Sequence, residues 1–203
     1  MGINIEDGKG SGQLAQVESN RLRVTATDCS LSNHVTLDAD DGGVYSVVAT
    51  HTWAGAGTFY PLFIQNTDPN YLMVLEKINV EVVSTSGGTA VPNVGDYFSL
   101  LFASVYSAAG TPYTPININR TSTKVANVSA FIANPTLTVT AAVEGNRLHP
   151  QANGVTNDLI VTGVNDIVLG RNNTLAIRYI TLTTAGTALV NLKFLMVAAA
   201  SMG

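Results

Sequence analysis

Apolar and polar residues alternate most regularly in the last third of the chain, where few residues are charged. The two segments with this pattern are 174–182 (TLAIRYITL) and 187–197 (TALVNLKFLMV). Alternation with a period of two places one set of side chains on each face of a β-strand. Because the stretch between them, 184–186, is short, the two strands are predicted to form a hairpin.

The first of these segments is apolar on both faces of its predicted strand. Leu175, Ile177 and Tyr179 share one face, and Ala176 and Ile180 share the other. A strand with two apolar faces is covered on both, by a second sheet or by another subunit. The pattern therefore predicts an all-β protein that assembles as a homo-oligomer.

Further strands are predicted at intervals along the preceding chain, with turn residues between them. Segment 58–65 contains Pro61, which marks an edge strand or a bulge, and a strong turn follows at 66–70. Segment 71–84 partly fits helical spacing, but its β-branched residues and continuous period-two set favour a strand. Segment 111–115 is predicted to be a loop, and the other predicted strands are 44–50, 95–107, 136–143, 159–162 and 167–169.

Short strands at this spacing, without a convincing amphipathic helix, are typical of a sandwich or a barrel. Length and strand number favour a jelly-roll-like antiparallel β-sandwich with an extended N-terminal arm. An up-and-down barrel is the main alternative. The best candidates for the core of the sandwich lie in the last strand and are Leu189, Leu192, Phe194 and Met196.

Residues 1–32 are predicted to form an N-terminal arm with a short strand, and residues 33–203 to form the sandwich body. Segment 6–13 combines glycine, serine and charge, a composition that stays mobile unless it is bound. As an alternative, segment 21–27 is simply the first strand of the sandwich. The arm also carries spaced apolar residues that a solvated linker would not need: Ile3, Ile5, Leu14, Val17, Leu22 and Val24.

Charge is scarce in the chain, and its distribution disfavours several partners. Charged residues make up 12% of the sequence, against about 25% in typical globular proteins, which fits a subunit that hides surface in an assembly. The net charge is -4 and the lysines and arginines are scattered, so no nucleic-acid partner is expected. The apolar run 194–202 is too short to cross a bilayer, and no signal-like apolar region opens the chain. Cytosolic synthesis without membrane contact is therefore expected.

No local arrangement of residues predicts catalysis, a metal or a cofactor. His34, His51 and His149 are far apart and lack the ligand spacing of metal sites. Cys29 is the only cysteine, so no internal disulfide is expected. The acidic stretch 38–41 lacks the later ligands of a calcium loop, so a solvated turn is favoured. The chain is expected to be non-enzymatic, with no catalytic, metal-binding or cofactor-binding residue.

One concentration of aromatic residues leaves two interpretations open. It consists of Trp53, Phe59, Tyr60, Phe63 and Tyr71. If these side chains were exposed, they could stack on sugars or anchor a protein partner. Packing in the core between neighbouring strands is the favoured interpretation, because aromatic residues often fill the cores of sandwiches.

Three segments resemble small virion proteins of tailed phages. They are the opening INIEDGKGSGQLAQVESNRLRVTAT, the middle FYPLFIQNTDPNYLMVLEKINVEVV and the closing LGRNNTLAIRY…ALVNLKFLMV, which together cover about half of the chain. The resemblance implies a capsid decoration (cement) or head-fibre protein with a jelly-roll body, usually a trimer, and it implies no catalytic residue. The implied location is the capsid surface of a virion, after synthesis in the host cytoplasm.

Three functions then compete. The first is a structural virion protein that binds the major capsid protein on the outside of a phage head, with the apolar residues of the arm adding to a sheet edge of the particle. The second is a glycan- or receptor-binding module of a phage fibre or tail. The third, a genome-packaging coat protein, is disfavoured because the arm carries only Lys9, Arg21 and Arg23 against four acidic residues.

Overall fold

The structure is a computed structural model of the chain, and it describes residues 16–18, 21–23, 43–83, 92, 95–118, 122–150, 157–160, 167–182 and 185–199. The chain separates into two compact units, Met1–His34 and Val35–Gly203. In the first unit, β1 (Gln16–Glu18) pairs antiparallel with β2 (Arg21–Arg23), and Val17 lies opposite Leu22.

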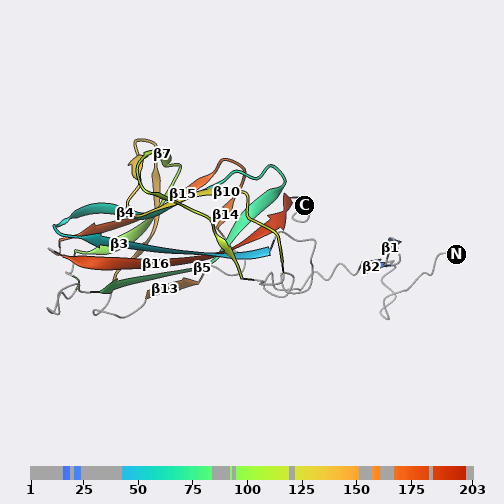
Figure 1. The fold of residues 1–203 in the computed structure, drawn as a ribbon, viewed down its shortest axis with the longest axis horizontal. Helices are drawn as coiled ribbons and strands as arrows, with labels where there is room; N and C mark the ends of the chain where they lie inside the picture. Colours follow the sequence, from blue (N-terminus) through green and yellow to red (C-terminus); the bar gives the residue numbers. More distant parts are fainter. Residues whose placement is uncertain are drawn as a thin grey trace. The chain divides into compact units, whose positions relative to one another are not determined.

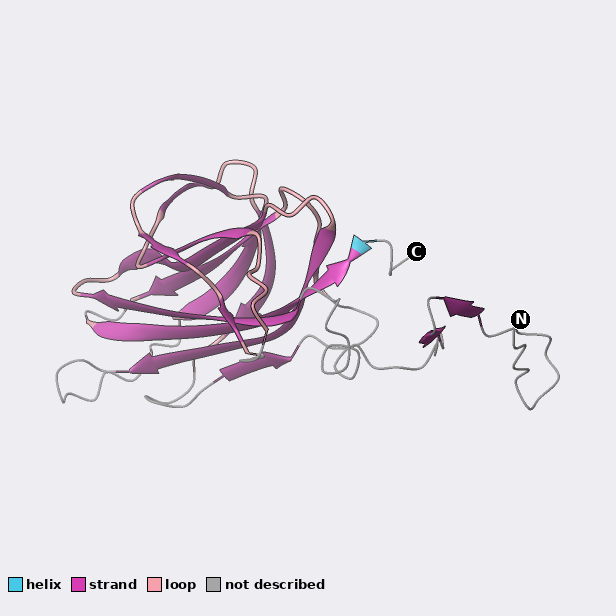
Figure 2. Ribbon diagram, turned by 45° about the vertical axis from the view of Figure 1, so that its right-hand side comes forward, coloured by secondary structure: helices cyan, strands magenta, loops and turns pink. Residues whose placement is uncertain are grey.

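The described part of the second unit consists of strands and the loops that join them, apart from a short helical piece at residue 199 (Figure 2). The main strands are β3 (Gly43–Trp53), β4 (Gly57–Asn66), β5 (Tyr71–Val83), β6 (Tyr97–Phe102), β12 (Val143–Leu148), β13 (Asn157–Ile160), β14 (Val168–Leu169), β15 (Thr174–Thr181) and β16 (Gly186–Ala198). An inserted segment between β6 and β12 adds β7 (Val105–Ala108), β8 (Thr111–Tyr113), β9 (Ile116–Asn117), β10 (Val128–Ile132) and β11 (Thr136–Thr138).

These strands form two large antiparallel sheets. The first sheet has the strand order β12-β6-β15-β4-β10-β8, and the second has the order β13-β5-β16-β3-β9. Figure 1 shows β3, β16, β5 and β13 of the second sheet side by side. β13 pairs with residues 77–80 of β5 and β14 with residues 73–74, so the two short strands together occupy one edge position.

The strand order is that of a jelly roll. The second sheet contributes β3, β16, β5 and the β13–β14 position, and the first sheet contributes β4, β15, β6 and β12. The chain changes sheet at each step from β3 to β6 and again from β14 to β16, as in two interlocked Greek keys. The predicted jelly-roll-like antiparallel sandwich is confirmed. An up-and-down barrel is ruled out because β3, β4, β5 and β6 do not pair with one another in sequence order.

The predicted hairpin between the last two strands is wrong. β15 pairs with β4 and β6 in the first sheet, whereas β16 pairs with β3 and β5 in the second. The connection between them therefore crosses from one sheet to the other. A short turn between two alternating segments fits either arrangement, because the alternation does not say which strand lies alongside.

Three other predictions fail in the inserted segment. The predicted strand 95–107 is broken at Ala103, whose φ of 58° lies in the left-handed region, so β6 and β7 are separate. The predicted strand 136–143 contains β11 and a turn, and β12 begins at Val143. The predicted loop 111–115 contains β8, an edge strand of the first sheet, which is a position where proline is tolerated.

The main core lies between the two sheets. Inside it Phe194 stacks on Tyr45 with ring centroids 5.5 Å apart. Leu192, Phe194 and Met196 are buried in this core as predicted. Leu189 is only partly buried, because it lies in the opposite phase of β16 from these residues and so points to the outer face of the second sheet.

A second, smaller apolar cluster lies on the outer face of the first sheet. Phe63, Leu101 and Ala176 are buried there beneath partly buried side chains that include Tyr106 and Leu137 of the inserted segment. The second apolar face of β15 is therefore covered by the chain itself. This finding removes the covering subunit that the sequence pattern allowed on that face.

The predicted turn between β4 and β5 is held by Asn66, whose side chain is fully buried. Its Nδ2 donates to Tyr71 O at 2.9 Å and to Leu169 O at 2.8 Å, and its Oδ1 accepts from Asp68 N at 3.0 Å. All polar atoms of this buried amide are satisfied. The turn residue also joins β4 of the first sheet to β14 on the edge of the second.

Pro61 lies in the interior of the first sheet at a β-bulge. Leu62 pairs with Ile177 and Phe59 with Tyr179, so two residues of β4 lie opposite Arg178 alone. Bulges accommodate the missing N–H of proline. The prediction of an edge or a bulge at this position is confirmed as a bulge.

Candidate binding groove

The residues predicted to bind a particle belong to the first unit. Val17 of β1 and Leu22 of β2 lie opposite each other in the two-stranded sheet. The binding role of all six residues stays a prediction. Outside the described residues lie Ile3, Ile5, Leu14 and Val24, together with Cys29, His34 and the acidic stretch 38–41.

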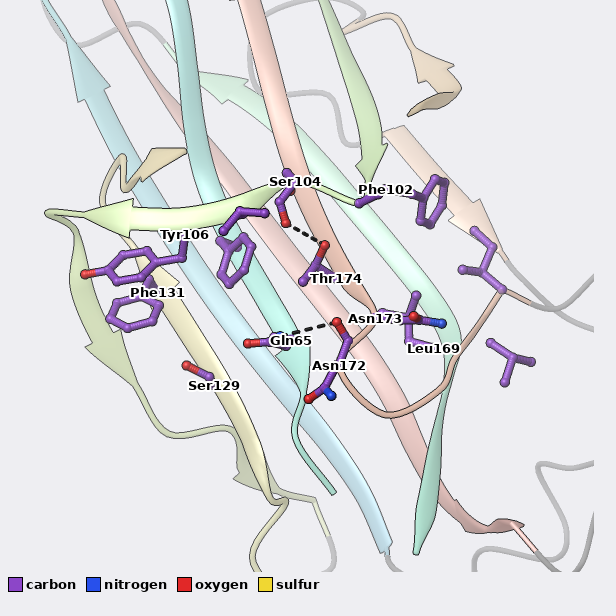
Figure 3. Close-up of a pocket in the computed structure, with 15 residues that line it drawn as sticks. Gln65, Phe102, Ser104, Tyr106, Ser129, Phe131, Leu169, Asn172, Asn173 and Thr174 are labelled. Carbon is purple, nitrogen blue, oxygen red and sulfur yellow. Dashed lines mark hydrogen bonds between the residues drawn. The ribbon is translucent and has the colours of Figure 1, made fainter. Parts of the chain in front are cut away.

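In the second unit, a groove of about 590 Å³ opens at one end of the outer face of the first sheet. Its lining comes from β4, β7, β10 and β14, from the end of β6 and the start of β15, and from the segments that precede β7, β14 and β15. A volume of this size is typical of sites for small ligands. Figure 3 shows the side chains that line it.

Aromatic side chains form one end of the groove. Tyr106 and Phe131 stack with ring centroids 3.8 Å apart and an angle of 9° between the rings, and Phe63 lies 6.0 Å from Tyr106. The hydroxyl of Tyr106 donates to Ala109 O at 3.0 Å, which orients the ring. Tyr106 and Phe131 are partly exposed, so the pair offers apolar surface to a ligand.

Amide and hydroxyl groups occupy the middle of the groove (Figure 3). Gln65 Nε2 donates to Asn172 O at 3.2 Å, and Asn172 N donates to Asn66 O at 2.7 Å. Thr174 Oγ1 donates to Ser104 O at 2.8 Å. These bonds tie the turn before β15 to β4 and to the connection before β7, so the polar groups stand on a fixed backbone.

Ser104 is the unusual residue of the groove. Its side chain is 1% exposed, and its Oγ has no hydrogen-bond partner among the residues that the structure describes. A buried hydroxyl without a partner costs about 1–3 kcal/mol, so it calls for an explanation. Two neighbours in the lining, Ala103 and Asn172, have positive φ angles of 58° and 66°, a conformation that costs an alanine about 1–2 kcal/mol.

The described lining is electrically neutral. Among the residues that the structure describes, none that lines the groove carries a carboxylate, imidazole, amine, guanidinium or thiol. The groove can therefore donate and accept hydrogen bonds and can stack on an apolar surface, but it has no counter-charge for an ionic ligand. Such a lining suits a neutral molecule better than an ion.

A second polar cluster lies before β6, where the carboxylate of Asp96 is buried. Leu182 N donates to its Oδ1 at 2.6 Å, and the hydroxyls of Thr181 and Tyr179 donate to its Oδ2 at 3.1 and 3.4 Å. Burial raises the pKa of Tyr179, so its hydroxyl remains a donor. The cluster joins the end of β15 to the start of β6, which is a structural task.

A third polar cluster lies on the exposed face of β12. The carboxylate of Glu144 accepts a hydrogen bond from Arg147 Nε at 2.6 Å and forms an ion pair with Arg178 Nη2 at 2.9 Å. The hydrogen bond from Arg147, together with Arg178, holds the pKa of Glu144 below its ordinary value. The guanidinium of Arg147 also lies 4.6 Å from the centre of the Tyr97 ring. Both arginines are therefore engaged within the chain.

His51 lies on the inner face of β3, 5.0 Å from the ring of Phe59. Its Nε2 is buried without a hydrogen-bond partner among the described residues, and burial lowers its pKa. Across the described ranges, no group of three His, Cys, Asp or Glu side chains could hold a metal ion. Within the same ranges, no helix has the length and apolar character to span a bilayer.

The aromatic concentration noted in the sequence packs inside the molecule. Trp53 lies 6.1 Å from Phe59 and 5.1 Å from Tyr179 in the main core, and Phe63 is buried in the outer cluster. The favoured packing interpretation is confirmed for these residues. Sequence reasoning missed the groove aromatics Tyr106 and Phe131, because no local pattern in the sequence shows that these two side chains stack on each other.

Comparisons of the chain with protein-family models, curated proteins and solved structures found no match. Inference about function therefore rests on the residues, the fold and the groove.

Proposed function

We propose that the chain is a non-enzymatic structural virion protein that binds the outside of a phage capsid and stabilises or decorates it. The jelly-roll strand order carries this proposal, because the architecture is shared by viral capsid and lectin domains. One fold can have many functions, so other features of the chain are needed to distinguish a virion protein from a lectin.

Two features of the sequence favour a virion role. Only 12% of the residues are charged, which suits a subunit with much surface in contact with other proteins. The six spaced apolar residues of the N-terminal segment, from Ile3 to Val24, suit attachment to a sheet edge of the major capsid protein. Neither nucleic acid nor a membrane is needed as a partner.

The proposal includes a homotrimer. Its support is now a set of exposed aliphatic side chains in the body, in place of the apolar pattern of the last two strands. Ile116, Ile118 and Val125 are 49%, 46% and 70% exposed. Asn117 Nδ2 donates to Lys124 O at 3.1 Å, which brings the segments that carry these three side chains together. Exposed aliphatic groups on neighbouring segments suit an interface between proteins.

The decisive experiment is co-sedimentation with capsids of the encoding phage that were assembled without this protein. The full chain should sediment with the capsids at a fixed ratio, and light scattering of the free protein should give three times the chain mass. A variant that lacks residues 2–19 should still fold and form trimers but should stay in the supernatant.

A matched pair of variants separates attachment from stability. Leu14→Ser with Val17→Ser in the full chain should weaken capsid binding, whereas Val48→Ser, at an exposed apolar position of the body, should not. Failure of the full chain to bind capsids would overturn the proposal. Full binding by the deletion variant would overturn the role of the N-terminal segment.

A further inference from the structure

The neutral groove on the first sheet has features that attachment to a capsid does not use. It holds a stacked aromatic pair, a row of amides and hydroxyls on a hydrogen-bonded backbone, and the unpartnered buried hydroxyl of Ser104. Each feature comes from a different part of the chain, between Phe63 and Thr174. Their convergence in one hollow is a tertiary property of the body.

We propose that this groove binds a neutral saccharide, with one sugar ring against the Tyr106–Phe131 pair. A pyranose ring has an apolar face of C–H groups, which packs on aromatic rings, and an edge of hydroxyls. Each sugar hydroxyl both donates and accepts hydrogen bonds, as do the side-chain amides of Gln65 and Asn172 and the hydroxyl of Ser129. Acidic or basic ligands are disfavoured because none of the described lining residues carries a charge to pair with them.

Ser104 provides the evidence that points most directly to a ligand. Ser104 lines the groove, and its Oγ is buried without a hydrogen-bond partner among the residues that the structure describes. A sugar hydroxyl that reaches this atom would supply the missing hydrogen bond, which otherwise stays a cost of the fold. A bound peptide fits less well. An extended peptide presents a row of backbone N–H and C=O groups, whereas the groove has only one hydroxyl that lacks a hydrogen-bond partner among the described residues.

The test uses the full chain and ligand-observed saturation-transfer NMR. The probes are glucose, galactose, mannose and N-acetylglucosamine, each as the monosaccharide and as a linear trisaccharide. Glucuronic acid and a neutral serine-containing tripeptide complete the set. At least one neutral saccharide should receive saturation, whereas glucuronic acid and the tripeptide should not. A response from monosaccharides indicates a free sugar, and a response from trisaccharides alone indicates a unit of a polysaccharide.

Two groove variants locate the site, and each has a matched control. Ser104→Ala removes the unpartnered hydroxyl, and Asn172→Gly removes an amide at a position whose φ of 66° suits glycine. Each should weaken binding about tenfold, the effect of one hydrogen bond, without lowering the melting temperature. Ser107→Ala and Ala133→Gly, which lie outside the groove lining, should bind like the unaltered chain.

Three results would overturn the proposal. The first is an absence of saturation on every neutral saccharide. The second is equal saccharide binding by the groove variants and the unaltered chain. The third is groove-dependent binding of the tripeptide in place of the saccharides, which would make the groove a peptide site. None of these results bears on capsid attachment, which is tested separately.

Discussion

The outer faces of the two sheets differ in what covers them. On the first sheet, side chains of β7, β10 and β11 in the inserted segment pack over Phe63, Leu101 and Ala176, which are buried. The same segment supplies Tyr106 and Phe131 to the neutral groove. The first sheet therefore has a second apolar layer and, at its margin, a groove.

The second sheet has polar pairs on its outer face. Ser46 Oγ donates to Asn191 Oδ1 at 3.1 Å across β3 and β16, and Lys193 Nζ lies 2.9 Å from the Glu76 carboxylate across β16 and β5. Val48, on the same face of β3, is 48% exposed. Cross-strand pairs of this kind stabilise a sheet that faces water.

The difference is visible in single strands. In β15 the residues of both phases are largely buried, whereas the middle of β16 alternates between buried inner residues and partly or fully exposed outer residues. A strand's local pattern therefore reports how many of its faces are covered. It does not report whether the cover is another sheet, another subunit or a distant part of the same chain.

The strongest test of this comparison places a carboxylate on each outer face. Ala176→Glu should destabilise the protein by about 3–5 kcal/mol or prevent folding, because the charge would be buried under the inserted segment without a partner. Val48→Glu, on the uncovered face, should change the unfolding free energy by no more than about 1 kcal/mol. Urea denaturation measures both. Equal, small effects would show that the inserted segment does not cover β15.

The two faces of β16 should also differ. Phe194→Ala should cost about 3–5 kcal/mol, because the ring is fully buried and stacks on Tyr45. Leu189→Ala should cost about 1 kcal/mol, because this side chain is only partly buried on the outer face. Guanidinium titration of both variants gives the difference. A larger loss for Leu189→Ala would reverse the assignment of inner and outer faces.

A smaller effect is expected where the inserted segment leaves the first sheet. Ala103→Gly should stabilise the protein by about 0.5–1 kcal/mol, because glycine adopts the positive φ of 58° without strain. Ala108→Gly in the extended strand β7 is the control and should destabilise by a similar amount. Thermal unfolding followed by circular dichroism measures both. A loss of stability in Ala103→Gly would contradict a strained connection.

The smallest effect should come from His51, on the inner face of β3. Burial lowers its pKa from the ordinary value of 6.5, so the unfolded chain takes up the proton first as the pH falls. The stabilising contribution of the neutral ring is present above pH 6.5 and is lost as the pH falls through the lowered pKa. Glu144, whose pKa is also lowered, should add a further loss below its ordinary value of 4.5.

The unfolding free energy of two variants is measured between about pH 8 and about pH 4, a range that includes the titration of histidine. His51→Gln should flatten the fall that begins near pH 6.5 and keep the later one. His149→Gln, at an exposed histidine, should keep both, because His51 is still present. If the pH dependence of the unfolding free energy were unchanged in His51→Gln, the His51 side chain would be accessible to water on the inner face of β3.

Sequence reasoning predicted the local elements well where one periodicity dominated. The strands at 44–50, 58–65 and 71–84, the turn that Asn66 holds and the bulge at Pro61 are present in the structure. It failed at Ala103, because a positive φ in an alanine has no signal in an apolar run. It also missed the groove, whose lining residues range from Phe63 to Thr174 and share no motif.

The sequence by itself determined that the chain is all-β, where most long strands run and which strand needs cover on both faces. These properties follow from a period of two between neighbouring residues, which is a local quantity. Only the tertiary structure decided that β15 and β16 belong to different sheets, that the inserted segment covers Ala176 and that Ser104 Oγ has no hydrogen-bond partner among the described residues. Those properties depend on contacts between residues far apart in the chain, and alternation along one strand carries no information about which strand lies beside it or above it.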